Sequence, residues 1–167
     1  MRVFLVGFMG AGKSTIGSLL APRLGVPFVD LDGLVSGAFA LPVPEIFRRH
    51  GEGAFRVEES RQLAAAAAGP GGVVMATGGG TFEQEANRDL IRRAGVSVFI
   101  DVPWELLLRR LPGKREDRPM FRSPEQAWQL FRRRLPYYRS ADLSVRPGEG
   151  EDATAVAGRI EFMLERL

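Results

Sequence analysis

Apolar residues follow two alternating patterns along the chain. Short runs in which nearly every residue is apolar predict buried strands, and longer stretches with apolar residues three and four positions apart predict helices. Because the two patterns alternate throughout, we expect an α/β fold with a parallel sheet covered by helices on both faces. The segments that predict strands are 3–6, 25–32 (a turn and then a strand), 73–77, 96–101 and 143–145.

Helices are predicted in the intervals between these strands. The first begins at Ser14, a short one is expected at 45–49, and another begins within 51–60 and runs through the alanines at 64–68. Residues 111–123 combine proline, glycine and charge without periodicity, which predicts a mobile loop. The remaining helices are expected at 83–93, 104–110, 124–139 and 151–167, the last with Val156, Ile160, Met163, Leu164 and Leu167 on its core face.

Length and composition narrow the classes of protein. The 167 residues suit a single domain spanning 1–167. The absence of cysteine and the single histidine, His50, exclude a disulfide framework and a cysteine or histidine metal cluster, so oxygen atoms would hold any metal. Without a membrane-length apolar run or a signal-peptide pattern, we expect no membrane association and a cytoplasmic location.

Positive charge is concentrated in one segment. From Arg109 to Arg139 ten Lys or Arg stand against three acidic residues, a local net charge of +7, so the total of +3 leaves −4 for the rest of the chain. The segment lacks the interleaved aromatic residues on which nucleic-acid bases stack. A small polyanionic ligand is therefore favoured over a nucleic acid.

The segment Gly7-Phe8-Met9-Gly10-Ala11-Gly12-Lys13-Ser14 fits the phosphate-loop pattern and stands between a predicted strand and a predicted helix. Backbone N–H groups of such a loop surround phosphates, the lysine reaches the β- and γ-phosphates, and the serine hydroxyl binds Mg²⁺. A turn without a ligand would explain the glycines but not the lysine. The chain has only two lysines beside 21 arginines, which indicates that Lys13 is needed as an ammonium group.

Two acids end one predicted strand, and three glycines follow the next predicted strand along the chain. Residues two apart on a strand share a face, so Asp30 and Asp32 are expected to point together into the crevice where parallel sheets bind ligands. One carboxylate can help to hold Mg²⁺ through water, and the other can accept a hydrogen bond from an acceptor hydroxyl. Gly78, Gly79 and Gly80 suit either a flexible turn or a loop whose amides approach a ligand closely.

This ordered set of residues closely resembles the shikimate kinase family over essentially the whole chain. The resemblance implies a three-layer P-loop kinase fold with a five-stranded parallel sheet in the order 2-3-1-4-5. It also implies ATP-dependent phosphorylation of the 3-hydroxyl of shikimate, which yields shikimate 3-phosphate and ADP in aromatic amino acid biosynthesis. The matching segments are the phosphate loop with Thr15, Asp30-Leu31-Asp32, Glu45-Ile46-Phe47, Gly51-Glu52, Phe55-Arg56, Gly78-Gly79-Gly80, Arg118-Pro119 and Arg134-Leu135-Pro136-Tyr137-Tyr138.

The resemblance assigns roles to individual residues. Lys13, Asp32 and Arg118 would be catalytic, Ser14 and Asp30 would serve Mg²⁺, and Glu59 would orient a substrate-binding arginine. Arg118 would belong to a lid at about 111–123, and the substrate would meet a segment at about 31–60. ATP would be bound by Gly10, Ala11, Gly12, Lys13, Ser14, Thr15, Arg110 and Arg118, and shikimate by Asp32, Arg56, Gly78, Gly79, Gly80 and Arg134. We expect the enzyme to act as a monomer on these two small molecules.

The structure of shikimate agrees with these residue types. Its carboxylate suits the guanidinium groups of Arg56 and Arg134, and its hydroxyls suit an acceptor such as Asp32. Three positions depart from the family, which often has Gly and Ser before the Glu-Ile-Phe motif and Glu in the preceding helix. Ala40, Pro42 and Ser36 stand there instead, so substrate affinity or closure is where this chain can differ.

Two other functions deserve comparison. A kinase of the same fold that acts on another small molecule, such as gluconate, would share the phosphate loop, but Asp32, Phe55-Arg56 and the triple glycine favour shikimate. A P-loop switch or a nucleic-acid-dependent NTPase should carry a base-recognition motif or a second domain, and the sequence has neither.

Overall fold

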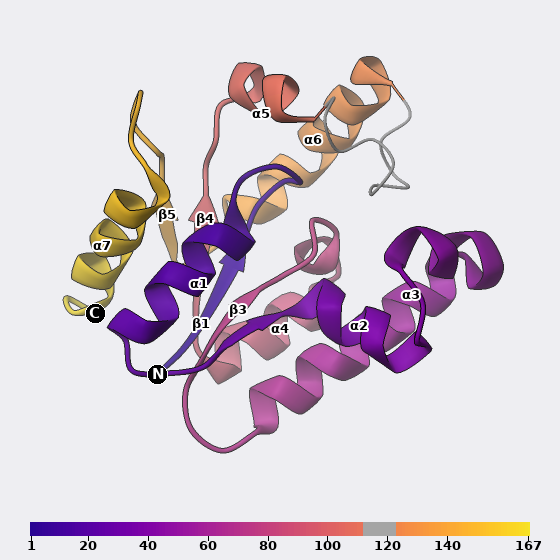
Figure 1. Ribbon diagram of the computed structural model, residues 1–167, viewed down its shortest axis with the longest axis horizontal. Helices are drawn as coiled ribbons and strands as arrows, with labels where there is room; N and C mark the ends of the chain where they lie inside the picture. Colours follow the sequence, from indigo (N-terminus) through magenta and orange to yellow (C-terminus); the bar gives the residue numbers. More distant parts are fainter. Residues whose placement is uncertain (112–122) are drawn as a thin grey trace.

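A five-stranded parallel sheet forms the centre of the molecule (Figure 1). The computed structural model describes residues 1–111 and 123–167. The strand order β2-β3-β1-β4-β5 is the predicted one. The strands are β1 (Arg2–Val6), β2 (Phe28–Asp30), β3 (Val73–Ala76), β4 (Val96–Ile100) and β5 (Leu143–Val145).

Helices cover both faces of this sheet. In Figure 1 α1 lies in front of the sheet beside α7, and α4 lies behind it. An ion pair of 2.7 Å between Arg23 and Glu161 joins α1 to α7. The helices are α1 (Lys13–Arg23), α2 (Leu31–Phe39), α3 (Val43–Ala68), the 3₁₀ helix η1 (Thr81–Glu83), α4 (Glu85–Ala94), α5 (Trp104–Arg110), α6 (Pro124–Tyr138) and α7 (Ala153–Leu164).

The strand register brings the carboxyl ends of β1, β2 and β3 together. Ala76 pairs with Leu5 on one side and with Asp30 on the other. The three strands therefore end at about the same level, and the loops after them share one edge of the sheet. Ligands bind at this edge in open parallel sheets.

Two groups of buried apolar side chains hold the elements together. The larger group lies on both faces of the sheet, where Phe4, Leu5 and Val98 are completely buried. The smaller one, Val35, Ile46 and Phe55, lies between α2 and the amino-terminal half of α3. The segment beyond β2 therefore has a small core of its own.

The segment after Asp30 differs from the prediction. Residues 31–39 form helix α2, which the sequence analysis did not predict, and Asp32 lies in its first turn instead of on a strand. The shared-face argument for Asp30 and Asp32 was therefore wrong. Asp30 ends β2 and caps the helix, because its carboxylate accepts hydrogen bonds from the backbone N–H groups of Asp32 and Gly33.

Most of the other boundaries are close to those predicted. The two helices expected on either side of Gly51 are present as α3, which is kinked at Gly51 with φ 81° and ψ 167°. The helix expected at 83–93 begins instead at Glu85, after η1. Leu167 does not face the core, since it lies beyond the end of α7 and is 72% exposed.

One predicted segment lies almost wholly outside the described residues. The lid proposed at 111–123 includes residues 112–122, and Arg118 is among them. Its proposed roles therefore stay predictions. Within residues 1–111 and 123–167, no helix is both long enough and apolar enough to cross a bilayer.

Candidate active site

The loop between β1 and α1 leaves an open anion site at the start of α1. Gly10 and Gly12 have φ of 81° and 90°, which is the left-handed region that glycine enters without strain. Gly12 is the N-cap residue, no side chain caps the helix, and its first turn has no acidic residue. The N–H groups at this helix end can therefore meet an anion, as the sequence predicts.

Lys13 lies folded against this loop. Its Nζ donates hydrogen bonds of 2.7 Å to the carbonyl oxygen of Gly7 and of 3.0 Å to that of Phe8. The side chain is 9% exposed, so the ammonium is largely withdrawn from water. These two hydrogen bonds hold the positive charge of Lys13 against the loop, where a phosphate would bind.

Ser14 and Asp30 place two side-chain oxygen atoms close together at the start of α1. The Ser14 Oγ donates a hydrogen bond of 2.5 Å to Asp30 Oδ2. A hydroxyl and a carboxylate suit Mg²⁺, which prefers oxygen and usually keeps several waters. No group of three or more His, Cys, Asp or Glu that could hold a metal occurs in the described part of the chain. The residues present therefore fit a metal that phosphate and water also coordinate.

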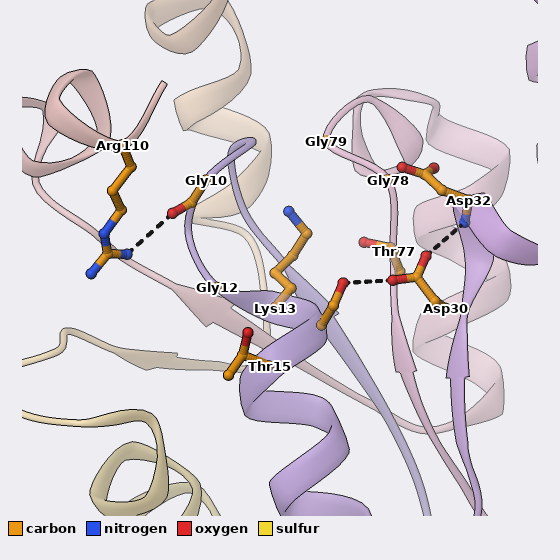
Figure 2. Close-up of a pocket in the computed structure, with 11 residues that line it drawn as sticks. Gly10, Gly12, Lys13, Thr15, Asp30, Asp32, Thr77, Gly78, Gly79 and Arg110 are labelled. Carbon is orange, nitrogen blue, oxygen red and sulfur yellow. Dashed lines mark hydrogen bonds between the residues drawn. The ribbon is translucent and has the colours of Figure 1, made fainter. Parts of the chain in front are cut away.

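One pocket joins the phosphate loop to Asp30 and Asp32 and to Gly78 and Gly79 (Figure 2). Gly80, Arg56 and Arg134 do not line it. Its volume is about 360 Å³. The predicted residues that line it are Gly10, Gly12, Lys13, Ser14, Thr15, Asp30, Asp32, Gly78, Gly79 and Arg110, and Thr77 lines it as well. Arg110 reaches the loop, because its Nη1 donates a hydrogen bond of 3.1 Å to the Gly10 carbonyl. Ala11 is buried in the loop and does not line the pocket.

Close packing explains the triple glycine. A Cβ atom at Gly78 would lie 2.5 Å from Glu59 Oε1 and 3.0 Å from Asp32 Oδ1. One at Gly80 would lie 2.4 Å from Arg56 Nη2. Packing of side chains against these glycines argues against a merely flexible turn, and close approach of the loop amides to a ligand stays a prediction. The neighbours that approach most closely are Glu59, Arg134 and Arg56, two arginines proposed to bind substrate and the acid proposed to orient one of them.

Arg56 is held beside the Gly78–Gly80 loop by the buried carboxylate of Glu59. Its Nη1 donates a hydrogen bond of 2.9 Å to Glu59 Oε2, and Glu59 is completely buried. Thr81 Oγ1 donates a second hydrogen bond of 2.7 Å to Glu59 Oε1. Burial opposes the charged form of Arg56, but the carboxylates of Glu59 and Glu52 outweigh it and raise the pKa of Arg56 above its ordinary value. The orienting contact predicted for Glu59 is thus present in the structure.

Arg134 approaches the same loop from α6. Its guanidinium is 2% exposed, and its Nη1 lies 3.3 Å from where a Cβ at Gly79 would stand. Its Nε donates a hydrogen bond of 3.1 Å to Glu83. Tyr138, one turn later, donates a hydrogen bond of 2.5 Å to the Gly79 carbonyl. Burial raises the pKa of the Tyr138 phenol well above its ordinary value, so the phenol remains a donor at neutral pH.

Sequence reasoning missed four polar residues around the site. They are Thr77, Thr81, Glu83 and Tyr138. Thr77 Oγ1 donates a hydrogen bond of 2.9 Å to the Leu5 carbonyl and so ties the end of β3 to β1. Tyr138 belongs to the Arg134–Tyr138 motif, which was a usable signal, but Thr77, Thr81 and Glu83 stand out only once the fold brings distant segments together.

Comparison with known proteins agrees with this geometry. The family model described as shikimate kinase matches residues 9–165. The shikimate kinase of Rhodopseudomonas palustris is 44% identical over 146 residues, which are 86% of this chain and 71% of that protein. That of Ruegeria pomeroyi is 41% identical over 168 aligned positions, which cover 99% of this chain and 82% of that protein.

A solved structure extends the match to three dimensions. The shikimate kinase of Acinetobacter baumannii in complex with shikimate superimposes with a TM-score of 0.92 at 32% identity, over 99% of this chain and 93% of that one. The family model, the relatives and the structure thus agree along almost the entire length. This chain belongs to the shikimate kinase family.

Proposed function

We propose that this protein transfers the γ-phosphoryl group of ATP to the 3-hydroxyl of shikimate and releases shikimate 3-phosphate and ADP. The product is an intermediate of aromatic amino acid biosynthesis. One observation carries the proposal: a single pocket joins the phosphate loop to Asp32, Gly78 and Gly79. Arg134 lies beside Gly79, and Arg56 lies beside the adjoining Gly80. A phosphate donor and a carboxylated acceptor could therefore meet there.

The donor half of the pocket would hold the phosphates. The N–H groups of the loop and the start of α1 would bind the β- and γ-phosphates, and Lys13 would move from its carbonyl partners to the transferring group. Ser14 and Asp30 would hold Mg²⁺, which neutralises charge on the phosphate oxygens when bound. Thr15 and Arg110 line the side of the pocket expected for the rest of ATP.

The acceptor half would hold shikimate. Arg56 and Arg134 would bind its carboxylate through paired N–H donors, and the backbone of Gly78 to Gly80 would close the site on one side. Asp32 would accept a hydrogen bond from the 3-hydroxyl, direct its lone pair at the γ-phosphorus and take its proton. Glu59 keeps Arg56 in place for this contact.

A screen of acceptors tests the proposed substrate. Purified protein with ATP and Mg²⁺ is offered shikimate, gluconate and water alone, and ³¹P NMR identifies the phosphorylated product. We expect one new phosphate monoester, at the 3-position of shikimate. Phosphorylation of gluconate in preference to shikimate would support the rival kinase, and ATP hydrolysis that ignores both acceptors would support a nucleotide switch.

The proposal includes a monomer, because one chain supplies both halves of the pocket. Sedimentation at assay concentration tests this. A cytoplasmic location and the lid role of Arg118 remain predictions of the sequence.

A further inference from the structure

Arg134 is a buried charge that is only partly satisfied by protein contacts. It is 2% exposed, and its Nε donates to Glu83 Oε2 at 3.1 Å. Its Nη2 is buried and has no hydrogen-bond partner within residues 1–111 and 123–167. A buried donor without a partner is costly, so such a group is expected to find one when ligand binds.

Glu83 is the acidic partner on the other side of this guanidinium. It ends η1, three residues after Gly80, and its two oxygens serve two arginines of α6. Oε2 faces Arg134, and Oε1 lies 2.8 Å from Nε of Arg133. Burial opposes the charged form of this carboxylate, but the hydrogen bonds and charges of the two arginines outweigh it and lower the pKa of Glu83 below its ordinary value. Glu83 is therefore anionic at neutral pH.

The two partners of Glu83 differ in their surroundings. The Arg133 side chain is 59% exposed, whereas that of Arg134 is 2% exposed. Water can replace Glu83 at Arg133, but it cannot easily do so at Arg134. The carboxylate consequently matters most to the buried arginine.

The arrangement is related to the one at Arg56. There Nη1 donates to the buried carboxylate of Glu59, Nε and Nη2 donate to Glu52 at 3.4 Å, and the guanidinium lies against Gly80. At Arg134 the Nε edge is bound by Glu83, and the Nη1 end lies near Gly79. Each arginine on the acceptor side is thus held by carboxylate, which fixes the plane of the guanidinium.

We propose that Glu83 is a positioning residue for the acceptor: it holds Arg134 by Nε so that the Nη nitrogens stay directed at the substrate carboxylate. This inference rests on the proposed function, because it assigns the occupant of the Nη nitrogens. Glu83 itself does not touch the substrate. Its removal weakens acceptor binding and leaves the transfer step almost intact.

Steady-state kinetics of Glu83→Gln test the proposal. Glutamine keeps the size and an acceptor oxygen but removes the charge. We expect KM for shikimate to rise about tenfold, with kcat within about threefold and KM for ATP unchanged, as for a lost charged hydrogen bond that acts in binding. Glu83→Asp keeps the charge but shortens the side chain. Its KM for shikimate should lie between those of Glu83→Gln and the wild type. The matched control is Arg133→Gln, which removes the exposed partner and should leave KM for shikimate within about twofold.

A double-mutant cycle separates positioning from a structural role. In an Arg134→Lys background, Glu83→Gln should change KM for shikimate by less than about twofold, because the group that it positions is gone. Equal effects of Glu83→Gln and Arg133→Gln, or additive effects of Glu83→Gln and Arg134→Lys, would overturn the inference alone. A wild-type protein without shikimate-dependent ADP release would overturn the proposed function and, with it, this inference.

Discussion

Asp32 is the residue on which the reactivity of the acceptor depends in the proposed reaction. Asp32→Asn keeps the size of the side chain but loses the carboxylate that would orient the 3-hydroxyl and accept its proton. We expect kcat to fall by about 10²-fold or more. Steady-state kinetics at saturating shikimate and ATP measure this effect.

Asp89→Asn is the matched control for that variant. Asp89 is an exposed carboxylate on α4 that pairs with Arg92, and it makes no contact with the pocket. Its substitution should leave kcat unchanged. A kcat near that of the wild type for Asp32→Asn would remove Asp32 from the mechanism.

Position 80 requires glycine because a neighbouring side chain leaves no room for a Cβ atom, and not because of its backbone conformation. Its φ of −97° suits any residue, but a Cβ atom would stand 2.4 Å from Arg56 Nη2 and 2.6 Å from its Cζ. Gly80→Ala should displace the guanidinium and raise KM for shikimate by about tenfold, as for a misplaced charged contact. Kinetics with varied shikimate test this.

The control for that variant is Gly53→Ala, in α3. A Cβ there would meet nothing within 4 Å, so its KM should not change. If both alanine variants bind shikimate normally, Arg56 does not hold the substrate in the orientation described.

Individual residues of the candidate site could be predicted from the sequence where they belong to a motif. The phosphate loop and the arginine motifs led to Lys13, Ser14, Arg56 and Arg134 without a structure. Glu83 belongs to no such motif. Its importance arises from α6, some fifty positions later, which brings Arg134 to within 3.1 Å of it.

At the scale of elements, the turn between α2 and α3 departs from the family pattern. Ala40, where the family often has glycine, has φ 52° and ψ 34° and is the one non-glycine residue of positive φ in the described ranges. A left-handed conformation costs an alanine about 1 kcal/mol. Ala40→Gly should therefore increase the free energy of unfolding by up to about 1 kcal/mol. Urea denaturation measures the change.

An alanine-to-glycine substitution elsewhere provides the comparison. Ala64 is exposed in α3, four residues before its carboxyl end, so Ala64→Gly should lower the free energy of unfolding by up to about 1 kcal/mol. Equal destabilisation by both substitutions would show that Ala40 is not strained.

The contact between η1 and α6 should depend on pH. Because the pKa of Glu83 is lowered below its ordinary value of 4.5 in the folded protein, its carboxylate stabilises the fold above about pH 4.5. That contribution is lost as the pH falls through the lowered pKa. The difference in unfolding free energy between wild type and Glu83→Gln should thus be largest near pH 7 and shrink below pH 4.5.

Urea denaturation at several pH values measures that difference. Glu85→Gln, an exposed carboxylate two positions away, is the control and should differ little from wild type at any of them. A Glu83→Gln difference that stayed constant down to pH 3 would contradict the ion pair.

The elements were predictable where hydrophobic periodicity dominates. Helix α5 and strand β5 begin and end at the predicted residues, Trp104–Arg110 and Leu143–Val145. Helix α2 was missed because it begins directly after β2 without a loop and contains Gly33 and Gly37. The sequence signal for the start of α2 is Asp30, whose side chain caps the helix. The sequence analysis had instead placed Asp30 on a strand and beside Mg²⁺.

On the scale of the whole molecule, the alternation of strands and helices predicted a parallel sheet with helices on both faces, whereas the strand order came from the resemblance to the family. The pocket was expected at the carboxyl ends of the strands, because parallel sheets bind ligands there. Its detailed form depends on contacts between distant segments. The hydrogen bonds from Tyr138 to Gly79 and from Thr81 to Glu59 are examples, and no local sequence pattern predicts them.

The central claim is that one pocket transfers phosphate from ATP to shikimate. A coupled assay of ADP release, run with ATP and Mg²⁺ with and without shikimate, tests it most directly. We predict rapid, saturable ADP release only when shikimate is present, and its loss in Lys13→Ala despite an unchanged fold by circular dichroism. ADP release that is the same with and without shikimate would contradict the account.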